Sequence, residues 1–202
     1  MTGGGEARIR GNEAFARGDF DEAVRIYEEG INFLPKNVVG EEEKETDSVS
    51  ATTAPANVPM DEDQERAVLL SNLAAARIKQ ERWEEAANAA TRAIEAGPPN
   101  EKALERRAYS YARIDAKLDE ALRDYRELMQ LFPDRTNYAE KVSEVEAKIK
   151  TRNEALKDEM IGKLKTFGNF CLKPFGLSTD SFEMTPNGEG GYSLNVKQGG
   201  QP

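Results

Sequence analysis

The sequence contains one helix-turn-helix pattern three times: ARIRGNEAFARGDFDEAVRIYEEGINFLP (residues 7–35), LSNLAAARIKQERWEEAANAATRAIEAGP (70–98) and LERRAYSYARIDAKLDEALRDYRELMQLFP (104–133). Each copy places a small residue twelve positions before its closing proline, and these pairs are Ala23 and Pro35, Ala86 and Pro98, and Ala121 and Pro133. Small residues let paired helices approach closely, and each pair buries its open face only by stacking on the next. The sequence therefore predicts an all-α solenoid.

The period and these small residues resemble the tetratricopeptide repeat (TPR), in which Gly or Ala lies where two helices cross and Pro follows the second helix. The first copy matches this pattern at Gly11, Ala23, Tyr27 and Pro35, and the third copy carries one extra residue in its turn. The resemblance implies a TPR helical solenoid of three helix-turn-helix repeats. Three pairs are about the minimum for a stable array.

Composition agrees with one helical domain plus extensions. The chain has 202 residues, of which 38% are hydrophobic and 32% are charged. No apolar run is long enough to span a membrane, and the first residues lack the apolar core of a secretory signal. A single cysteine, Cys171, excludes an intramolecular disulfide and suits a reducing compartment. We therefore expect a soluble, cytoplasmic protein, and we expect Cys171 to pack beside its apolar neighbours.

The negative charge of the chain is concentrated between the first and second repeats. Residues 38–66 hold nine acids against two cations, a net charge of −7, whereas the whole chain has −9. The segment is rich in Ser, Thr and Pro and has no aromatic residue, which predicts a disordered insertion. Two interpretations stay open: a solvated loop, or a mobile acidic segment that competes in cis for a basic groove.

After the third repeat, apolar residues at spacings of three, four or seven predict one long helix over 137–165 that caps the open end of the solenoid. The tail then contains SFEMT and YSLNV around the turn-prone PNGEGG, which is a β-hairpin signal. An isolated hairpin is marginal in water. The tail therefore either packs against the long helix, binds a partner, or stays flexible.

These signals divide the chain into five regions. They are the first TPR (1–37), the acidic disordered insertion (38–66), the second and third TPRs (67–135), the capping helix (136–165), and the tail with its hairpin (166–202).

Five polar residues fall on the first helices of the three repeats. They are Arg8, Asn12, Asn72, Lys102 and Arg106. Two pairs are four residues apart, so each pair shares one helix face. First helices line the concave surface of a solenoid, so all five side chains can face one groove. Three cations and two amides offer the donors that two neighbouring carboxylates need.

Two resemblances bear on these residues and on the tail. The order of three repeats, a charged helix, GKLKTFGNFCLKPFGLSTDSFEM and a Gly-rich turn before YSLNV resembles the tetratricopeptide repeat protein 1 family. The five polar residues match the two-carboxylate clamp of repeat proteins that hold EEVD tails of cytosolic heat-shock chaperones of the 70 and 90 kDa classes. Arg8 stands where that pattern usually has Lys. The resemblance implies a co-chaperone adaptor in which Arg8, Asn12 and Asn72 hold the terminal carboxylate, while Lys102 and Arg106 engage the preceding acidic residues.

Neighbouring groove residues would contact the apolar residue that precedes the acidic end of such a peptide. The candidates are Phe15, Leu73, Ala76, Lys79 and Arg113. The client protein that such an adaptor would bring to a chaperone is not indicated by any motif.

Catalysis and nucleic-acid binding find little support. The chain has no His, which removes Ser-His and Cys-His pairs and His-bearing metal sites, and it has no phosphate-binding loop. We expect no enzymatic activity, cofactor or metal. Cations are interleaved with Glu at an overall pI of about 4.8, which disfavours nucleic acid. The alternative function is a TPR scaffold that binds a non-chaperone protein through the groove or through LKPFGLST.

Overall fold

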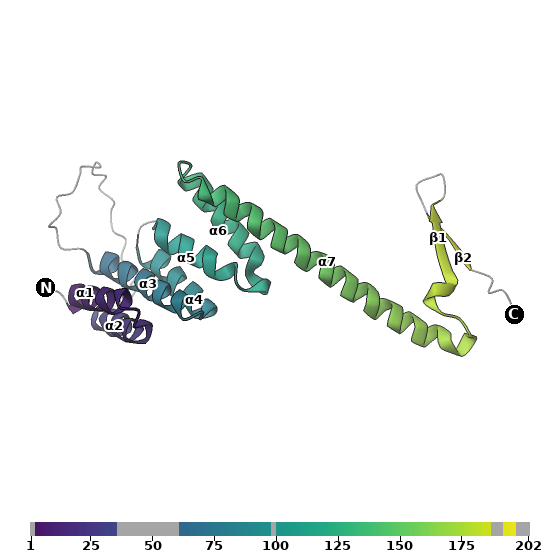
Figure 1. Ribbon diagram of the computed structural model, residues 1–202, viewed down its shortest axis with the longest axis horizontal. Helices are drawn as coiled ribbons and strands as arrows, with labels where there is room; N and C mark the ends of the chain where they lie inside the picture. Colours follow the sequence, from purple (N-terminus) through teal and green to yellow (C-terminus); the bar gives the residue numbers. More distant parts are fainter. Residues whose placement is uncertain (1–2, 36–60, 98–99, 187–191, 197–202) are drawn as a thin grey trace, which may run out of the picture. The chain divides into compact units, whose positions relative to one another are not determined.

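A computed structural model describes residues 3–35, 61–97, 100–186 and 192–196 (Figure 1). The chain forms two compact units, Met1–Ile149 and Lys150–Pro202. The first unit holds the helical repeats, and the second holds the end of the last helix and a small β-hairpin. Among the described residues, no helix is both long enough and apolar enough to cross a membrane.

The first unit consists of three antiparallel helix pairs and the beginning of a seventh helix. The pairs are α1 (Gly3–Ala16) with α2 (Phe20–Phe33), α3 (Glu62–Lys79) with α4 (Trp83–Ala96), and α5 (Glu101–Tyr111) with α6 (Leu118–Leu131). The seventh helix is α7 (Asn137–Leu172). The predicted all-α repeat solenoid is confirmed. The extra residue of the third repeat is accommodated by a 3-10 turn, η1 (Asp115–Lys117).

The turns within the pairs follow from local chemistry. Asp19 caps α2 by accepting a hydrogen bond from the backbone of Glu22 at 3.2 Å. Gly18 has a φ of 81°, a left-handed conformation that glycine adopts without steric cost. Asn100 caps α5 by accepting from the backbone of Lys102 at 3.0 Å. This cap fixes the first turn of α5, which carries one of the predicted site residues.

The small residues at the helix crossings are fully buried, as predicted. Ala23, Ala86 and Ala121 each have 0% exposure. One hydrophobic cluster joins the first two pairs. A second cluster joins α5, α6 and the first half of α7, where Tyr138 and Val145 are buried. The first half of α7 therefore covers the end of the repeats, which is the role predicted for the capping helix.

The last residues of the predicted acidic insertion are helical. Residues 62–66 belong to α3, and Glu65 is buried at 5% exposure. Arg66 donates hydrogen bonds to the carbonyls of Ile31, at 3.3 Å, and Pro35. Arg66 thereby joins the start of α3 to carbonyls at the C-terminal end of α2, which the helix leaves unpaired. Residues 38–60 of the predicted insertion lie outside the described residues.

The last helix is longer than predicted, because α7 ends at Leu172 and not at residue 165. Pro174 lies two residues later, and proline cannot continue a helix. Two short 3-10 turns follow, η2 (Lys173–Phe175) and η3 (Thr179–Ser181). The backbone N–H of Thr179 donates to Oδ1 of Asn169 at 2.5 Å, so the segment after α7 folds back on the end of this helix. Cys171 is exposed, so the prediction that it packs among apolar residues is wrong.

The predicted hairpin is present in the second unit. Strand β1 (Phe182–Pro186) pairs with β2 (Tyr192–Val196) in antiparallel register, with Met184 opposite Leu194. The turn between them, residues 187–191, lies outside the described residues. Contact of the hairpin itself with a partner stays a prediction.

Candidate peptide-binding site

The two predicted asparagines meet between α1 and α3. Nδ2 of Asn72 donates to Oδ1 of Asn12 at 3.1 Å. The hydroxyl of Tyr27 on α2 donates to the same oxygen at 2.7 Å. Burial raises the pKa of Tyr27, so the phenol stays a neutral donor. Because both acceptor directions of Oδ1 are filled, the amide orientation of Asn12 is fixed and its Nδ2 donors are left for a ligand.

Arg106 connects α5 to the same place. Its Nη1 donates to both the backbone carbonyl and the hydroxyl of Ser71, each at 2.6 Å, and Ser71 is the neighbour of Asn72 on α3. Burial lowers the pKa of Arg106, with the charge of Glu105 acting in the opposite direction. An arginine remains charged under these conditions. Within the described part of the chain, no carboxylate forms an ion pair with Arg106, so its charge is held partly buried without an acidic partner.

Lys102 lies one helical turn before Arg106 and is exposed. Its backbone is held by the cap from Asn100, while no ion pair to its ammonium occurs among the residues that the structure describes. The structure therefore brings together side chains from α1, α3 and α5, in the order Asn12, Asn72, Arg106. Lys102 continues this row on α5.

Arg8 is tied to an acid that the sequence did not single out. Its Nε lies 4.0 Å from Oε1 of Glu65, whose side chain is only 7% exposed, whereas the side chain of Arg8 is 37% exposed. The Nε atom is buried and makes no hydrogen bond within the described chain. One edge of the guanidinium thus faces a buried carboxylate. The charge that Arg8 offers to a ligand is partly offset by Glu65.

Two of the five predicted groove neighbours are corrected by the structure. Leu73 and Ala76 are buried at 5% and 0% exposure in the first hydrophobic cluster, so they present almost no surface to a peptide. They point inward because α3 is packed against helices on several sides and leaves a narrow exposed strip. Asn72 and Ala75 lie on this strip, since both are only partly buried and lie three residues apart.

The other three predicted groove neighbours keep exposed surface. Phe15 is half-buried, and Lys79 is exposed in the last turn of α3. Arg113 is exposed and lies over the ring of Tyr109 at 4.9 Å, and its Nη2 donates to the hydroxyl of that residue at 2.8 Å. Its guanidinium also lies 5.7 Å from the ring centre of Trp83.

Sequence reasoning missed four residues that shape this site. They are Tyr27, Glu65, Ser71 and Tyr109. For Tyr109 a signal existed, because it lies three residues after Arg106 and four before Arg113 on one helix face. Ser71 acts partly through its backbone carbonyl. Every residue has this group, so the contact cannot be predicted from the residue type.

The arrangement is suited to binding an anion. The side chains are donors, with cations spaced along α5 and amides on α1 and α3. Over the described ranges, no cluster of His, Cys, Asp and Glu could hold a metal ion. A ligand with two or more negatively charged groups would satisfy Asn12, Asn72, Lys102 and Arg106 together.

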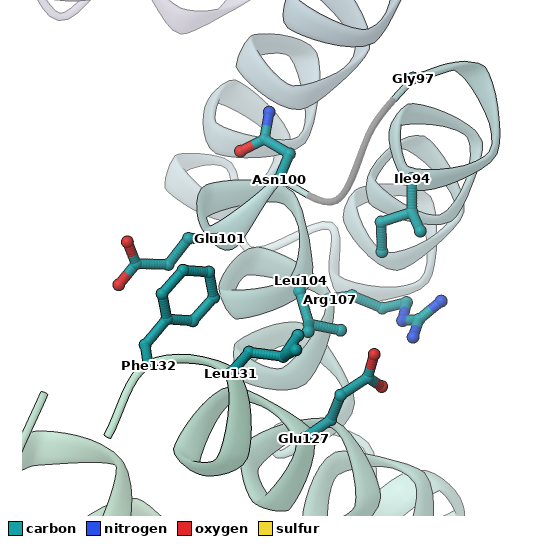
Figure 2. A pocket seen from close by; sticks show the side chains of 9 residues that line it. All are labelled: Ile94, Gly97, Asn100, Glu101, Leu104, Arg107, Glu127, Leu131 and Phe132. Carbon is teal, nitrogen blue, oxygen red and sulfur yellow. The ribbon is translucent and has the colours of Figure 1, made fainter. Parts of the chain in front are cut away.

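A separate cavity of about 140 Å³ lies at the junction of α4, α5 and α6 (Figure 2). Ile94, Leu104 and Phe132 contribute apolar side chains to its lining. Arg107 also lines it, and its Nε and Nη2 donate to the carboxylate of Asp124 at 2.8 and 2.9 Å. None of the five predicted clamp residues lines this cavity, so it is distinct from the row on α1, α3 and α5.

Comparison with known families gives one match over most of the chain. Residues 6–150 match the profile of the family described as bacterial transcriptional activator domain. The mouse protein sperm-associated antigen 1 is 32% identical over 159 residues, which is 79% of this chain and 14% of that protein. The chain thus spans a small part of the curated relative that it matches.

Two solved structures resemble the fold and also share a quarter of the aligned residues. The myosin chaperone UNC-45 from C. elegans, solved in complex with an Hsp90 peptide, is 26% identical with a TM-score of 0.54, covering 78% of this chain and 14% of that chain. The second TPR domain of human RPAP3, solved in complex with the HSP70 peptide SGPTIEEVD, is 25% identical with a TM-score of 0.50. That match covers 69% of this chain and 92% of the RPAP3 domain.

Proposed function

We propose a function for this chain from the premise that it belongs to the family described as bacterial transcriptional activator domain and has the fold of the TPR domains. A repeat fold supplies a surface, while the residues on that surface select the ligand. The proposed function is that of a protein-binding adaptor, a co-chaperone. It holds the acidic EEVD-type C-terminus of cytosolic heat-shock chaperones of the 70 and 90 kDa classes in a carboxylate clamp.

One observation carries this proposal: a partly buried guanidinium without an acidic partner lies beside a pair of fixed amides. Arg106 reaches from α5 to Ser71, next to the contact between Asn72 and Asn12. Holding a charge in a partly desolvated place is unfavourable unless a counter-charge arrives. A peptide that ends in a carboxylate and carries acidic side chains would supply that counter-charge at this place.

We infer the roles of the five residues from their resemblance to the two-carboxylate clamp. Asn12, Asn72 and Arg8 would hold the terminal carboxylate, and Lys102 with Arg106 would engage the acidic side chains and backbone before it. Two relatives in fold support this assignment, because their solved complexes contain an HSP70 peptide ending in EEVD and an Hsp90 peptide. Arg8 offers a planar fork where the usual lysine offers a point charge.

Within the TPR proteins, we propose a relation to the tetratricopeptide repeat protein 1 family. The support is the motif LKPFGLST, which begins at the end of α7 and continues through η2. A cytoplasmic location belongs to the same proposal, since the proposed partners are cytosolic.

The test is calorimetric binding of the peptide SGPTIEEVD as its free acid and as its C-terminal amide. We expect binding of the free acid in the micromolar range. The amide and the Arg106→Ala protein should each lose about 2 kcal/mol or more, as for a buried charge-assisted contact. Arg92→Ala is the matched control, because Arg92 is an exposed arginine on α4.

Each alternative result has a defined meaning. Equal binding of acid and amide would reject the clamp, since a clamp requires a free carboxylate. Absence of binding by the wild-type chain would favour the scaffold alternative, in which the groove or the LKPFGLST segment binds a non-chaperone protein.

A further inference from the structure

The second half of α7 carries a row of exposed apolar side chains. Leu156, Met160, Leu164 and Phe167 are spaced by four, four and three residues, so they share one helix face. Their exposures are 49%, 70%, 70% and 66%. Single exposed apolar residues are ordinary, but a contiguous row of large ones marks an interaction surface. We refer to these four residues as the α7 stripe.

The described turns of the tail leave this face exposed. Thr179 meets α7 at Gly168, where an added Cβ would lie 2.6 Å from its Cγ2, and at Asn169, which accepts its backbone N–H. Gly168 follows Leu164 by one helical turn, so Thr179 meets α7 at the edge of the stripe, while the four stripe side chains themselves stay exposed. The 3-10 turns of the tail therefore leave the α7 stripe uncovered.

The first half of α7 shows which kind of element this face accepts. Tyr138 and Val145, at the same helical spacing, are buried in one cluster with Leu118, Tyr125 and Leu128 of α6. The helix α6 is amphipathic, and an ion pair joins its Arg126 to Glu146 of α7 at 2.7 Å. The face that continues as the α7 stripe thus binds an amphipathic helix in its first half.

Charge indicates the character of the missing partner. Residues 150–173 hold six cations and three acids, a net charge of +3 within a chain of net charge −9. By helical spacing, Arg152, Lys157 and Lys163 flank the stripe, with Glu159 paired to Lys163 at 2.6 Å. The remaining acids, Glu154 and Asp158, lie on the opposite face. Two copies of this helix would bring cation beside cation, which disfavours self-association.

We propose that the α7 stripe is a docking surface for one amphipathic α-helix of another protein, with an aliphatic face and acidic flanks. This surface is independent of the carboxylate clamp, since it needs no free carboxylate and lies in the second unit. An adaptor with two such surfaces can hold two ligands of different chemistry at once.

The probe is a 28-residue peptide made of two α6 sequences, LDEALRDYRELMQL, in tandem. Each α6 sequence has 14 residues, so two copies keep the apolar face in a heptad register. The peptide carries an acetylated N-terminus and an amidated C-terminus, which removes the free carboxylate that the clamp would bind. Its affinity for the full chain is measured by fluorescence anisotropy, beside a peptide of the same composition in scrambled order.

We expect saturable binding of the patterned peptide and weaker binding of the scrambled one. The double variant Leu164→Glu with Phe167→Glu should lose about tenfold or more in affinity, since each side chain would otherwise be buried by the partner. Ala155→Glu is the matched control, because Ala155 is exposed on the same helix and lies one, five, nine and twelve residues from the stripe residues, away from their face. Lys157→Glu should weaken binding severalfold at low salt, by about the strength of a surface ion pair.

Three outcomes would overturn the proposal. The first is binding that the Leu164→Glu and Phe167→Glu variant retains in full. The second is concentration-dependent dimerisation of the free chain that this variant abolishes, which would assign the stripe to a second copy. The third is stripe-dependent binding to vesicles of phosphatidylcholine with 30% phosphatidylserine in the absence of peptide binding, which would assign the stripe to a lipid surface. Circular dichroism of each variant checks that the helices are intact.

Discussion

At the scale of single residues, the groove depends on polar groups that fix one another. Asn12 is the clearest case, because its Oδ1 accepts from Tyr27 and from Asn72, and this leaves its Nδ2 for a ligand. An unsupported amide rotates easily and loses part of its binding energy in being ordered. The proposed specificity therefore rests partly on residues that never touch the peptide.

The first residue-scale prediction concerns Tyr27→Phe. Removal of the hydroxyl frees one acceptor direction of Asn12, so we expect the affinity for SGPTIEEVD to fall about threefold to tenfold, as for loss of a typical hydrogen bond. Tyr125→Phe is the control, because Tyr125 is the equivalent buried residue of the third repeat. Calorimetry would contradict the argument if both variants bound the peptide as tightly as the wild-type chain.

The second residue-scale prediction concerns Glu65→Gln. Glu65 lies 4.0 Å from Nε of Arg8 and offsets its charge. Neutralising Glu65 should increase peptide affinity by roughly 0.5–1 kcal/mol, the size of a partly exposed ion-pair contact. Glu62→Gln removes an exposed acid from the same helix turn and should leave affinity almost unchanged. A decrease in affinity for Glu65→Gln would show instead that Glu65 orients Arg8 for the ligand.

The sequence predicted that Asn12, Asn72 and Arg106 lie near one another, but it did not predict which neighbours are exposed, for one physical reason. Asn12, Asn72 and Arg106 are recognisable because repeat spacing fixes which residues share the concave face. The rotation of α3 about its axis is set by its tertiary contacts, so Leu73 and Ala76 could not be separated from Ala75 by spacing alone. Contacts such as those of Ser71 and Glu65 join elements across gaps of 35 or more residues, and no local pattern reports them.

At the scale of elements, the third repeat contains a buried ion pair that joins α5 to α6. Arg107 donates two hydrogen bonds to Asp124, whose side chain is 5% exposed. The hydrogen bond to Asp124 raises the pKa of Arg107, so the arginine keeps its charge in the folded state. Loss of one partner leaves the other charge uncompensated in a place that water reaches poorly.

We therefore predict that Asp124→Ala lowers the free energy of unfolding by about 3 kcal/mol or more. Glu146→Ala, which breaks the exposed pair with Arg126 between α6 and α7, should cost less than about 1 kcal/mol. Urea denaturation followed by far-ultraviolet circular dichroism measures both. Similar effects for the two variants would mean that burial does not set the strength of these pairs. Replacing Arg107 and Asp124 together by leucine should recover part of the loss.

The helix α7 shows how a sequence-based boundary fails. The spacing of apolar residues predicts a helix to residue 165 and assigns the glycine and phenylalanine residues that follow to the tail. An isolated glycine weakens a helix by only about 1 kcal/mol relative to alanine, so Gly162 and Gly168 do not end it. The helix ends at Leu172, close to Pro174, which lacks the backbone N–H that a helix needs. The hairpin was predictable because its alternation and its turn are local signals.

At the scale of the whole molecule, the two units carry the two proposed surfaces. Arg8, Asn12, Asn72, Lys102 and Arg106 all lie within Met1–Ile149, together with both hydrophobic clusters. The α7 stripe lies within Lys150–Pro202. A solenoid is stabilised by contacts between neighbouring repeats, so removal of a segment beyond its capping contacts should leave the repeats folded.

This division yields the last prediction, made for the fragment 1–149. Its affinity for SGPTIEEVD should remain within about twofold of that of the full chain, because distant and independent sites contribute additively. Its affinity for the tandem α6 peptide should vanish, since Leu156, Met160, Leu164 and Phe167 are absent from it. The full chain with Arg106→Ala should show the reverse behaviour, with the helix peptide bound and the acidic peptide lost. If the fragment folds but loses the acidic peptide, the second unit must contribute to the groove, and the assignment of one ligand to each unit is wrong.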